Sequence, residues 1–198
     1  MNGPAPCNFT AASPVNNAAT AVRYPTELID VWLSRDGERM TMRPVLWQDD
    51  PGLRALFKRT STAARDVIDN FPEVLDGLCD LDFVKQVAVV ITVDHGGSQR
   101  IVADARYLVA DNAASADFAV LVEDGWRRQG VGRRALGGLV DAARRAGLKS
   151  LRSTVKRTNA PMLLLLHRCG FSAASDGCAA TTGLVTMARD VYVGGIDI

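Results

Sequence analysis

The chain contains 198 residues, of which 47% are hydrophobic and 23% are charged, and its formal net charge at pH 7 is +1. This length and composition are typical of one globular domain. No apolar run approaches the roughly 18 residues that a membrane-spanning helix needs, so we expect no membrane partner. Four widely spaced cysteines and two histidines form neither a CxxC pair nor a metal-binding pattern. We therefore expect no metal and a cytoplasmic location.

The N-terminal residues differ in composition from the rest of the chain. Residues 1–25 are rich in Ala, Asn, Pro and Thr, and they lack the basic and apolar regions of a secretion signal. Such a composition predicts a flexible N-terminal leader. The remaining residues, 26–198, are then expected to form a single folded domain.

Alternation of apolar and polar residues predicts several short strands. Two extended segments, 28–33 and 40–45, flank the turn residues Arg35-Asp36-Gly37, which is typical of a β-hairpin. The other expected strands cover 87–93, 100–109, 116–122, 151–155, a segment from Phe171 onward, and 184–191.

Helical periodicity and capping residues predict four helices between these strands. The first opens at Asp49-Asp50-Pro51, where acids and a proline suit a helix N-terminus, and a short second helix covers 61–69. The third covers 131–146, and the fourth covers 159–170, from an asparagine cap to a terminating glycine. Residues 71–83 fit either helix or loop. The order of elements indicates a mixed α/β domain.

One loop carries the clearest chemical signal. The apolar strand that ends at Val122 is followed by a short acidic bend and by Arg127-Arg128-Gln129-Gly130-Val131-Gly132, after which a helix begins at once. Glycine has no Cβ, so the backbone N–H groups there can approach a ligand closely. A helix N-terminus adds unpaired N–H groups and partial positive charge, which together attract anions. The loop therefore predicts a site for a phosphorylated cofactor.

The charge distribution supports an anionic ligand in the same region. The segment 127–157 contains ten basic residues and a single acid, Asp141, so it carries a net charge of +9 while the rest of the chain carries −8. Some of these charges belong to the solvated faces of amphipathic helices. The segment lacks the interleaved aromatic residues that bind single-stranded nucleic acid, and it matches no DNA-binding motif, so we expect no specific nucleic-acid partner.

The glycines of the loop fit two different cofactor motifs. Residues 130–135 match G-x-G-x-x-A, the dinucleotide fingerprint, and Lys156 and Arg157 would then be placed to accept an NADP 2′-phosphate. That fingerprint normally follows a strand directly, near the start of a parallel βαβ unit. Here seven residues separate Val122 from Gly130, and the preceding strands look antiparallel. The dinucleotide interpretation is therefore the less favoured of the two.

The second motif is R-x-x-G-x-G over 127–132, and it resembles the acyl-coenzyme A loop of the GNAT acetyltransferase superfamily. The resemblance continues in the N-x₁₀-G-F pattern over 159–171. Two further patterns are similar to the acetyltransferase domain of Pat-type protein lysine acetyltransferases. These are R-D-G-x₅-R-P over 35–44 and D-x-W-x₃-G-x-G over 124–132.

The resemblance implies a mostly antiparallel central sheet that is splayed at the cofactor site and flanked by helices. The pantetheine arm of acetyl-CoA would lie between the strands 116–122 and 150–155, and the pyrophosphate would lie on the N–H groups from Arg128 to Arg133. Asn159 would contact the cofactor arm or cap its helix. The cofactor-binding residues implied are Val120, Leu121, Val122, Arg127, Arg128, Gln129, Gly130, Val131, Gly132, Arg133 and Asn159.

Acetyl transfer to an amine also needs a general base, because a lysine with a pKa near 10.4 is mostly protonated at pH 7. The resemblance implies that Asp117 is this base, where the related enzymes carry a glutamate, and Glu123 is the second candidate. Leu166 takes the position at which many of these enzymes carry a tyrosine acid. We do not expect His167 or Cys169 to be catalytic. His167 is expected to be an exposed helix residue, and Cys169 a small buried residue.

The sequence therefore predicts an N-acetyltransferase that moves an acetyl group from acetyl-CoA directly to a primary amine, on a protein lysine or a small molecule. The alternative is a catalytically weak or inactive acyl-CoA-binding module that acts as a sensor or interaction protein. The resemblance is compatible with a homodimer.

Overall fold

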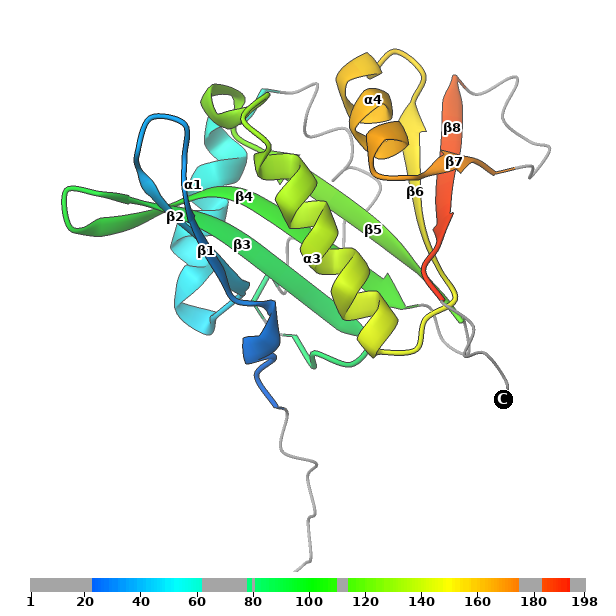
Figure 1. Cartoon of the computed structure of the whole chain (residues 1–198), viewed down its shortest axis with the longest axis horizontal. Coiled ribbons are helices and arrows are strands. Elements are labelled where there is room, and N and C mark those ends of the chain that lie inside the picture. The colour runs from blue at the N-terminus through cyan, green and yellow to red at the C-terminus, as the bar shows by residue number, and fades with distance from the viewer. Residues whose placement is uncertain (1–22, 62–77, 80, 110–113, 175–182, 193–198) are drawn as a thin grey trace, which may run out of the picture.

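The computed structural model describes residues 23–61, 78–79, 81–109, 114–174 and 183–192 (Figure 1). Most of the predicted leader and nearly all of the predicted helix 61–69 lie outside the described residues, and so does most of the ambiguous segment 71–83.

A single eight-stranded sheet forms the centre of the molecule, in the order β1-β2-β3-β4-β5-β6-β8-β7. All neighbouring strands are antiparallel except β5 and β6, which are parallel. This confirms the predicted mostly antiparallel α/β fold. The strands are β1 (Asp30–Leu33), β2 (Arg39–Pro44), β3 (Gln86–His95), β4 (Ser98–Val109), β5 (Ser115–Val122), β6 (Ser150–Lys156), β7 (Ser172–Ala173) and β8 (Leu184–Asp190).

Helices lie on both faces of the sheet. Figure 1 shows α3 (Val131–Arg145) across the front face and α1 (Asp50–Arg59) behind the sheet, while α4 (Ala160–Arg168) lies near β6 and β8. Short 3₁₀ turns, η1 (Thr26–Leu28), η2 (Trp47–Asp49) and η4 (Asp124–Trp126), precede β1, α1 and α3. In the described ranges, no helix is long and apolar enough to cross a bilayer.

The differences from the sequence predictions are small and lie at element ends. Leu28 was expected in the first strand of the hairpin but lies in η1, where its backbone N–H donates to Pro25. The strand expected from Phe171 onward is only two residues long where it is described. Turn geometry and edge pairing decide such boundaries, and apolar periodicity does not report on them.

Two apolar clusters bury the two faces. The larger cluster packs α3 against the sheet through residues such as Leu136, Leu139 and Phe118. The smaller one packs Leu53, Leu56 and Phe57 of α1 against Val90 and Leu121. The alternation along β5 therefore places even-numbered side chains toward α3 and odd-numbered ones toward α1. This alternation decides which side chains of β5 lie on the α1 face.

Candidate active site

The strands β5 and β6 are paired only at one end. The parallel register joins Ser115, Ala116 and Asp117 to Ser150, Leu151 and Arg152, and it continues no further among the described residues. From there β6 pairs with β8 along its whole length, from Ser150 to Lys156. Figure 1 shows β5 and β6 diverging beyond this point. The second half of β5 therefore has a strand neighbour on one side only.

The direction of the backbone groups follows from one hydrogen bond. The Glu123 N–H donates to the Val102 carbonyl at 2.9 Å, so the odd-numbered residues of β5 direct their backbone groups toward β4. Val120 and Val122 consequently direct theirs toward the gap. Leu121, also predicted to hold the cofactor, instead faces β4 with its backbone and has its side chain buried beneath α1. The gap thus offers an extended ligand the polar groups of alternate residues.

The loop after β5 presents a run of unpaired donors. Among the described residues, none accepts a hydrogen bond from the backbone N–H groups of Arg128 through Arg133. Arg128 (φ 63°) and Gly130 (φ 84°) both have left-handed backbone conformations, which turn the chain into α3. A Cβ built on Gly130 would meet no heavy atom within 4 Å, so the space above this turn is open. Such a run at a helix N-terminus is a site for an anion.

The basic side chains around this loop have different environments. Arg127 folds back onto the protein: its Nε donates to the Val122 carbonyl at 3.2 Å, and its guanidinium pairs with Asp124. Arg128 and Arg133 are exposed. The Gln129 side chain donates to the Gly125 carbonyl at 3.0 Å and so stabilises the loop itself. Arg128 and Arg133 are therefore the arginines available to an anion, while Arg127 supports the turn.

Asp117, the first predicted base, lies at the closed end of the gap. Its side chain is exposed, and as an odd-numbered residue of β5 it belongs to the α1 face. It is in register with Arg152 of β6 and with Leu108 of β4. Among the described residues, its carboxylate makes no hydrogen bond or ion pair. The carboxylate is therefore available to a substrate.

Glu123, the second predicted base, is in the opposite situation. The residue is buried, and its Oε1 accepts from Arg59 Nε at 3.1 Å and forms an ion pair with Arg100. Arg59 also donates to the Ile101 carbonyl at 2.9 Å. Oε2 is buried and has no partner among the described residues. Glu123 therefore links the end of β5 to α1 and β4, a role that sequence reasoning missed because its partners are far away in the chain.

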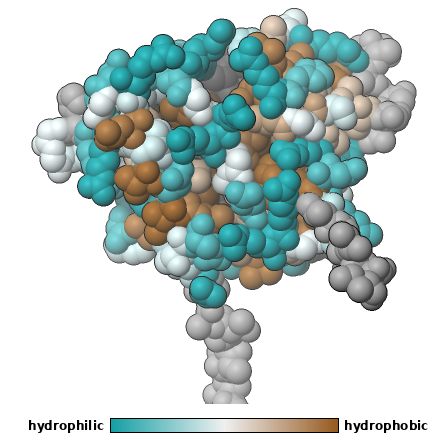
Figure 2. Space-filling view, viewed as in Figure 1, coloured by the Kyte–Doolittle hydropathy of each residue, from teal (hydrophilic) through white to brown (hydrophobic). Residues whose placement is uncertain are grey.

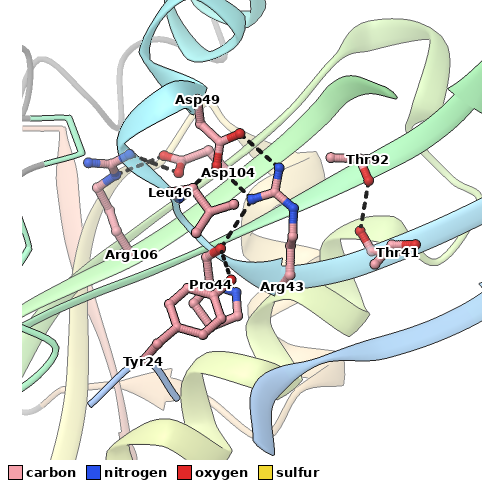
Figure 3. Close-up of polar contacts among 9 residues, drawn as sticks. All are labelled: Tyr24, Thr41, Arg43, Pro44, Leu46, Asp49, Thr92, Asp104 and Arg106. Atoms are coloured by element: carbon pink, nitrogen blue, oxygen red, sulfur yellow. Dashed lines mark hydrogen bonds and ion pairs between the residues drawn. The ribbon is translucent and has the colours of Figure 1, made fainter. Parts of the chain in front are cut away.

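Two bidentate ion pairs hold the start of α1 and the centre of the α1 face (Figure 3). Arg43 donates to both carboxylate oxygens of Asp49 at 2.6 and 2.8 Å, and this hydrogen bonding raises the pKa of Arg43 above its usual value. Arg106 donates to both oxygens of Asp104 at 2.8 Å. Tyr24 adds a hydrogen bond to the Pro44 carbonyl at 2.8 Å, and burial raises its pKa. The Arg43-Pro44 part of the motif noted in the sequence is therefore structural.

A polar pocket of about 420 Å³ opens beside these ion pairs, between α1 and the strands β3 and β4. Its walls include Arg59, Arg100, Gln48 and Gln99. None of the site residues predicted from the sequence lines this pocket. Two of the wall residues, Arg59 and Arg100, contact Glu123 and so connect the pocket to the end of β5.

The residues of α4 have mainly structural roles. The Asn159 side chain accepts a hydrogen bond from the Met162 N–H at 3.2 Å, which is the helix cap of the two roles predicted. Leu166 is fully buried, and His167 is exposed. Burial raises the pKa of the Cys169 thiol.

Trp126, at the end of η4, packs against the core. Within the described ranges, no group of three or more His, Cys, Asp or Glu side chains is placed to hold a metal ion.

Sequence comparison links the chain to known acetyltransferases. The profile of the acetyltransferase (GNAT) family matches residues 65–171. Acetyltransferase PA5475 of Pseudomonas aeruginosa is 27% identical over 172 residues, which cover 83% of this chain and 92% of that protein.

Structural comparison finds the same fold. The GNAT domain of S. lividans PAT has a TM-score of 0.72 at 21% identity, and the match covers 85% of this chain and 99% of that domain. The ribosomal-protein-S18-alanine N-acetyltransferase of Escherichia coli has a TM-score of 0.57 at 20% identity, over 80% of this chain and 98% of that one. A cAMP-binding acyltransferase from Mycobacterium smegmatis has a TM-score of 0.57 at 24% identity, and 84% of this chain matches 49% of it. The family profile spans more than half of the sequence, and the chain belongs to the acetyltransferase (GNAT) family.

Proposed function

We propose that this chain is an acetyl-CoA-dependent N-acetyltransferase that transfers the acetyl group directly to a primary amine. The observation that carries this proposal is the run of unpaired N–H groups from Arg128 to Arg133, beside a strand edge that has lost its neighbour. The two features supply what a long phosphorylated thioester needs, an anion site at one end and an extended polar edge along its arm.

The residues present fit acetyl-CoA in both respects. The pyrophosphate would be held by the loop N–H groups, with Arg128 and Arg133 adding charge. The pantetheine arm would bond to the Val120 backbone and the Val122 N–H, because the Val122 carbonyl already accepts from Arg127. When bound, the thioester supplies the activated acetyl group. The dinucleotide alternative fits less well, because β5 and β6 are paired in parallel at one end only, and the rest of the described sheet is antiparallel, unlike a dinucleotide-binding domain built on a parallel sheet.

Asp117 is the residue we assign as general base. Its carboxylate is exposed and unpaired in the described part of the chain, and it is on the same face as α1. It would accept a proton from the acceptor ammonium, directly or through one water, and so release a neutral amine for attack. Glu123 is less suited to this role, because one carboxylate oxygen is engaged by two guanidinium groups and the other is buried.

Direct transfer is favoured over a covalent intermediate by the state of Cys169. This thiol lies at the end of α4 with its pKa raised by burial, which disfavours the thiolate that acts as a nucleophile. The adjacent exposed His167 does not pair with it in the described structure. The acceptor amine itself is therefore the nucleophile in this proposal.

The acceptor is proposed to be a protein lysine or a small amine. A protein acceptor has a precedent among proteins of the same fold, because the Escherichia coli neighbour is named as a ribosomal-protein-S18-alanine N-acetyltransferase. A transfer assay with labelled acetyl-CoA, lysine-containing peptides and a panel of small amines decides between the two. We expect saturable transfer to at least one acceptor class and its loss in Asp117→Asn. No transfer to any acceptor would contradict catalysis.

The alternative is an acyl-CoA-binding module with little or no turnover. It is favoured by the full burial of Leu166 at the position where many related enzymes have a tyrosine acid, and by the shorter aspartate at 117. The enzyme and the binding module predict different results for acetyl transfer. Tight binding of acetyl-CoA with no transfer, unchanged in Asp117→Asn, would support the module and contradict the enzyme.

A further inference from the structure

The strand β1 forms one edge of the sheet and carries an apolar stripe. Ile29, Val31 and Leu33 alternate along it with exposed fractions of 46%, 49% and 69%. Figure 2 shows hydrophobic side chains following β1 across an otherwise mostly polar surface. Edge strands of soluble proteins usually carry charges or proline, because an exposed apolar edge pairs with other strands. β1 is short and carries one charge, Asp30, but the side chains that alternate with Asp30 and Trp32 form an exposed apolar stripe, and this stripe indicates a partner.

Among the described residues, the backbone of β1 presents a specific set of groups without a hydrogen-bond partner. The Ser34 N–H donates to the Glu38 carbonyl at 2.8 Å, so alternate residues of β1, including Trp32 and Asp30, direct their backbone groups toward β2. Val31 and Leu33 therefore direct their N–H and C=O groups outward. The Ile29 N–H is already used, since it donates to the Thr26 carbonyl at 3.0 Å, and its C=O remains.

We propose that β1 pairs antiparallel with β1 of a second copy of this chain, about a two-fold axis at Val31. In this register Val31 of each copy donates to and accepts from Val31 of the other. The Leu33 N–H of each copy donates to the Ile29 carbonyl of the other. The only donor missing from the ladder is the Ile29 N–H, which Thr26 already satisfies. The free donors and acceptors are thus matched by a second copy of the same strand.

The side chains are complementary in the same register. On one face, Ile29, Val31 and Leu33 of both copies come together and cover each other. On the other face, Asp30 lies opposite Trp32 of the second copy. Arg134 lies over the Trp32 ring at 4.3 Å from its centroid and pairs with Asp30 of its own chain at 2.6 Å. Each aspartate would therefore meet an arginine from both copies.

The proposed interface lies four strands away from β5 in the sheet. Arg134, in the first turn of α3, contacts Asp30 and Trp32 and so links β1 to the anion loop, but Val31 and Leu33 alternate with these two residues and lie on the other face of the strand. The inference does not depend on acetyl transfer. Substitutions in β1 are expected to change self-association and to leave acetyl-CoA binding unchanged, which separates the two proposals experimentally.

Sedimentation equilibrium of the full chain over a wide concentration range provides the first test. We expect a reversible dimer of twice the 21.2 kDa chain mass. Val31→Lys should weaken self-association by roughly tenfold or more, because it places a charge in the apolar stripe. Val84→Lys is the matched control, since Val84 is also exposed (69%) and lies just before β3, outside β1. A monomer at every concentration, or a dimer that Val31→Lys leaves unchanged, would overturn the proposal.

A cysteine substitution tests the register itself. At the two-fold axis, the two Val31 Cα atoms would be about 5.5 Å apart, which is within the range of a disulfide. Val31→Cys should therefore form a covalent dimer under mild oxidation. Leu33→Cys should not, because its two copies would be roughly 13 Å apart. The unsubstituted chain and Val84→Cys report the background from native cysteines. Equal or faster cross-linking through Leu33→Cys would contradict the register.

Discussion

The two ends of β5 carry carboxylates of the same face with opposite environments. At the closed end, Asp117 is exposed and unpaired in the described structure. At the open end, Glu123 is buried and holds Arg59 and Arg100. A buried carboxylate needs partners, whereas an exposed one can exchange water for a substrate. In our proposal, the exposed end of β5 therefore carries the general base, whereas the buried carboxylate at the other end supports the structure next to the anion loop.

The largest expected effect comes from removing the free carboxylate. Asp117→Asn should lower kcat by about 10²–10⁴ while leaving the Kd for acetyl-CoA and the stability almost unchanged. Single-turnover kinetics together with calorimetry measure these quantities separately. If activity survives this substitution and disappears in Glu123→Gln, the two ends have the opposite roles.

The anion loop can be tested at Gly130, where a side chain would project into the space in which we expect the ligand to bind. Gly130→Asp should weaken acetyl-CoA binding at least tenfold, about 1.4 kcal/mol, because it adds a negative charge and a Cβ above the unpaired N–H groups. Gly37→Asp is a matched control: its φ is 82° against 84° for Gly130, and a Cβ at either position has open space. Both variants should lose similar stability. A control that loses as much affinity as Gly130→Asp would contradict a local site.

The structural role of the other end predicts a change in stability. Glu123→Gln should lower the free energy of unfolding by about 1–3 kcal/mol, because two guanidinium groups lose a charged acceptor. Asp141→Asn is the control, since its side chain is 62% exposed in its ion pair against 10% for Glu123. Urea unfolding of both variants measures the difference. Equal losses would show that burial of Glu123 contributes nothing.

Substitution of Asn159 distinguishes a helix-capping role from a cofactor-binding role. Asn159→Ala should lower stability by about 1 kcal/mol through loss of the cap to Met162. Thermal unfolding and acetyl-CoA titration of the same variant report the two roles separately. A large loss of affinity without a loss of stability would assign Asn159 to the cofactor instead.

The smallest effect concerns two half-buried thiols. Burial raises the pKa of Cys79 to about 11 and also raises that of Cys169. Since the thiolate is the reactive form, both should be alkylated slowly at pH 8 and faster as the pH rises. Mass spectrometry of the modified peptides measures each rate. Rapid modification of Cys169 at neutral pH would weaken the case for direct attack by the amine.

The sequence predicted the elements better than the contacts between them. The hairpin, the strand before the loop and the helix starting at Val131 follow from local periodicity and capping, which need only neighbouring residues. The anion loop was identified for the same reason. The pairing of Glu123 with Arg59 and Arg100 joins residues far apart in the chain, and the direction of the Leu121 backbone depends on which strand lies beside β5. No local sequence pattern predicts these ion pairs or the direction of the Leu121 backbone.

The most direct test of the proposed function is a calorimetric titration of the full chain with acetyl-CoA and, separately, with NADPH. We predict stoichiometric binding of acetyl-CoA and no binding of NADPH under the same conditions, because the loop and the open edge of β5 together fit the thioester. Binding of NADPH alone, or of neither ligand, would contradict it.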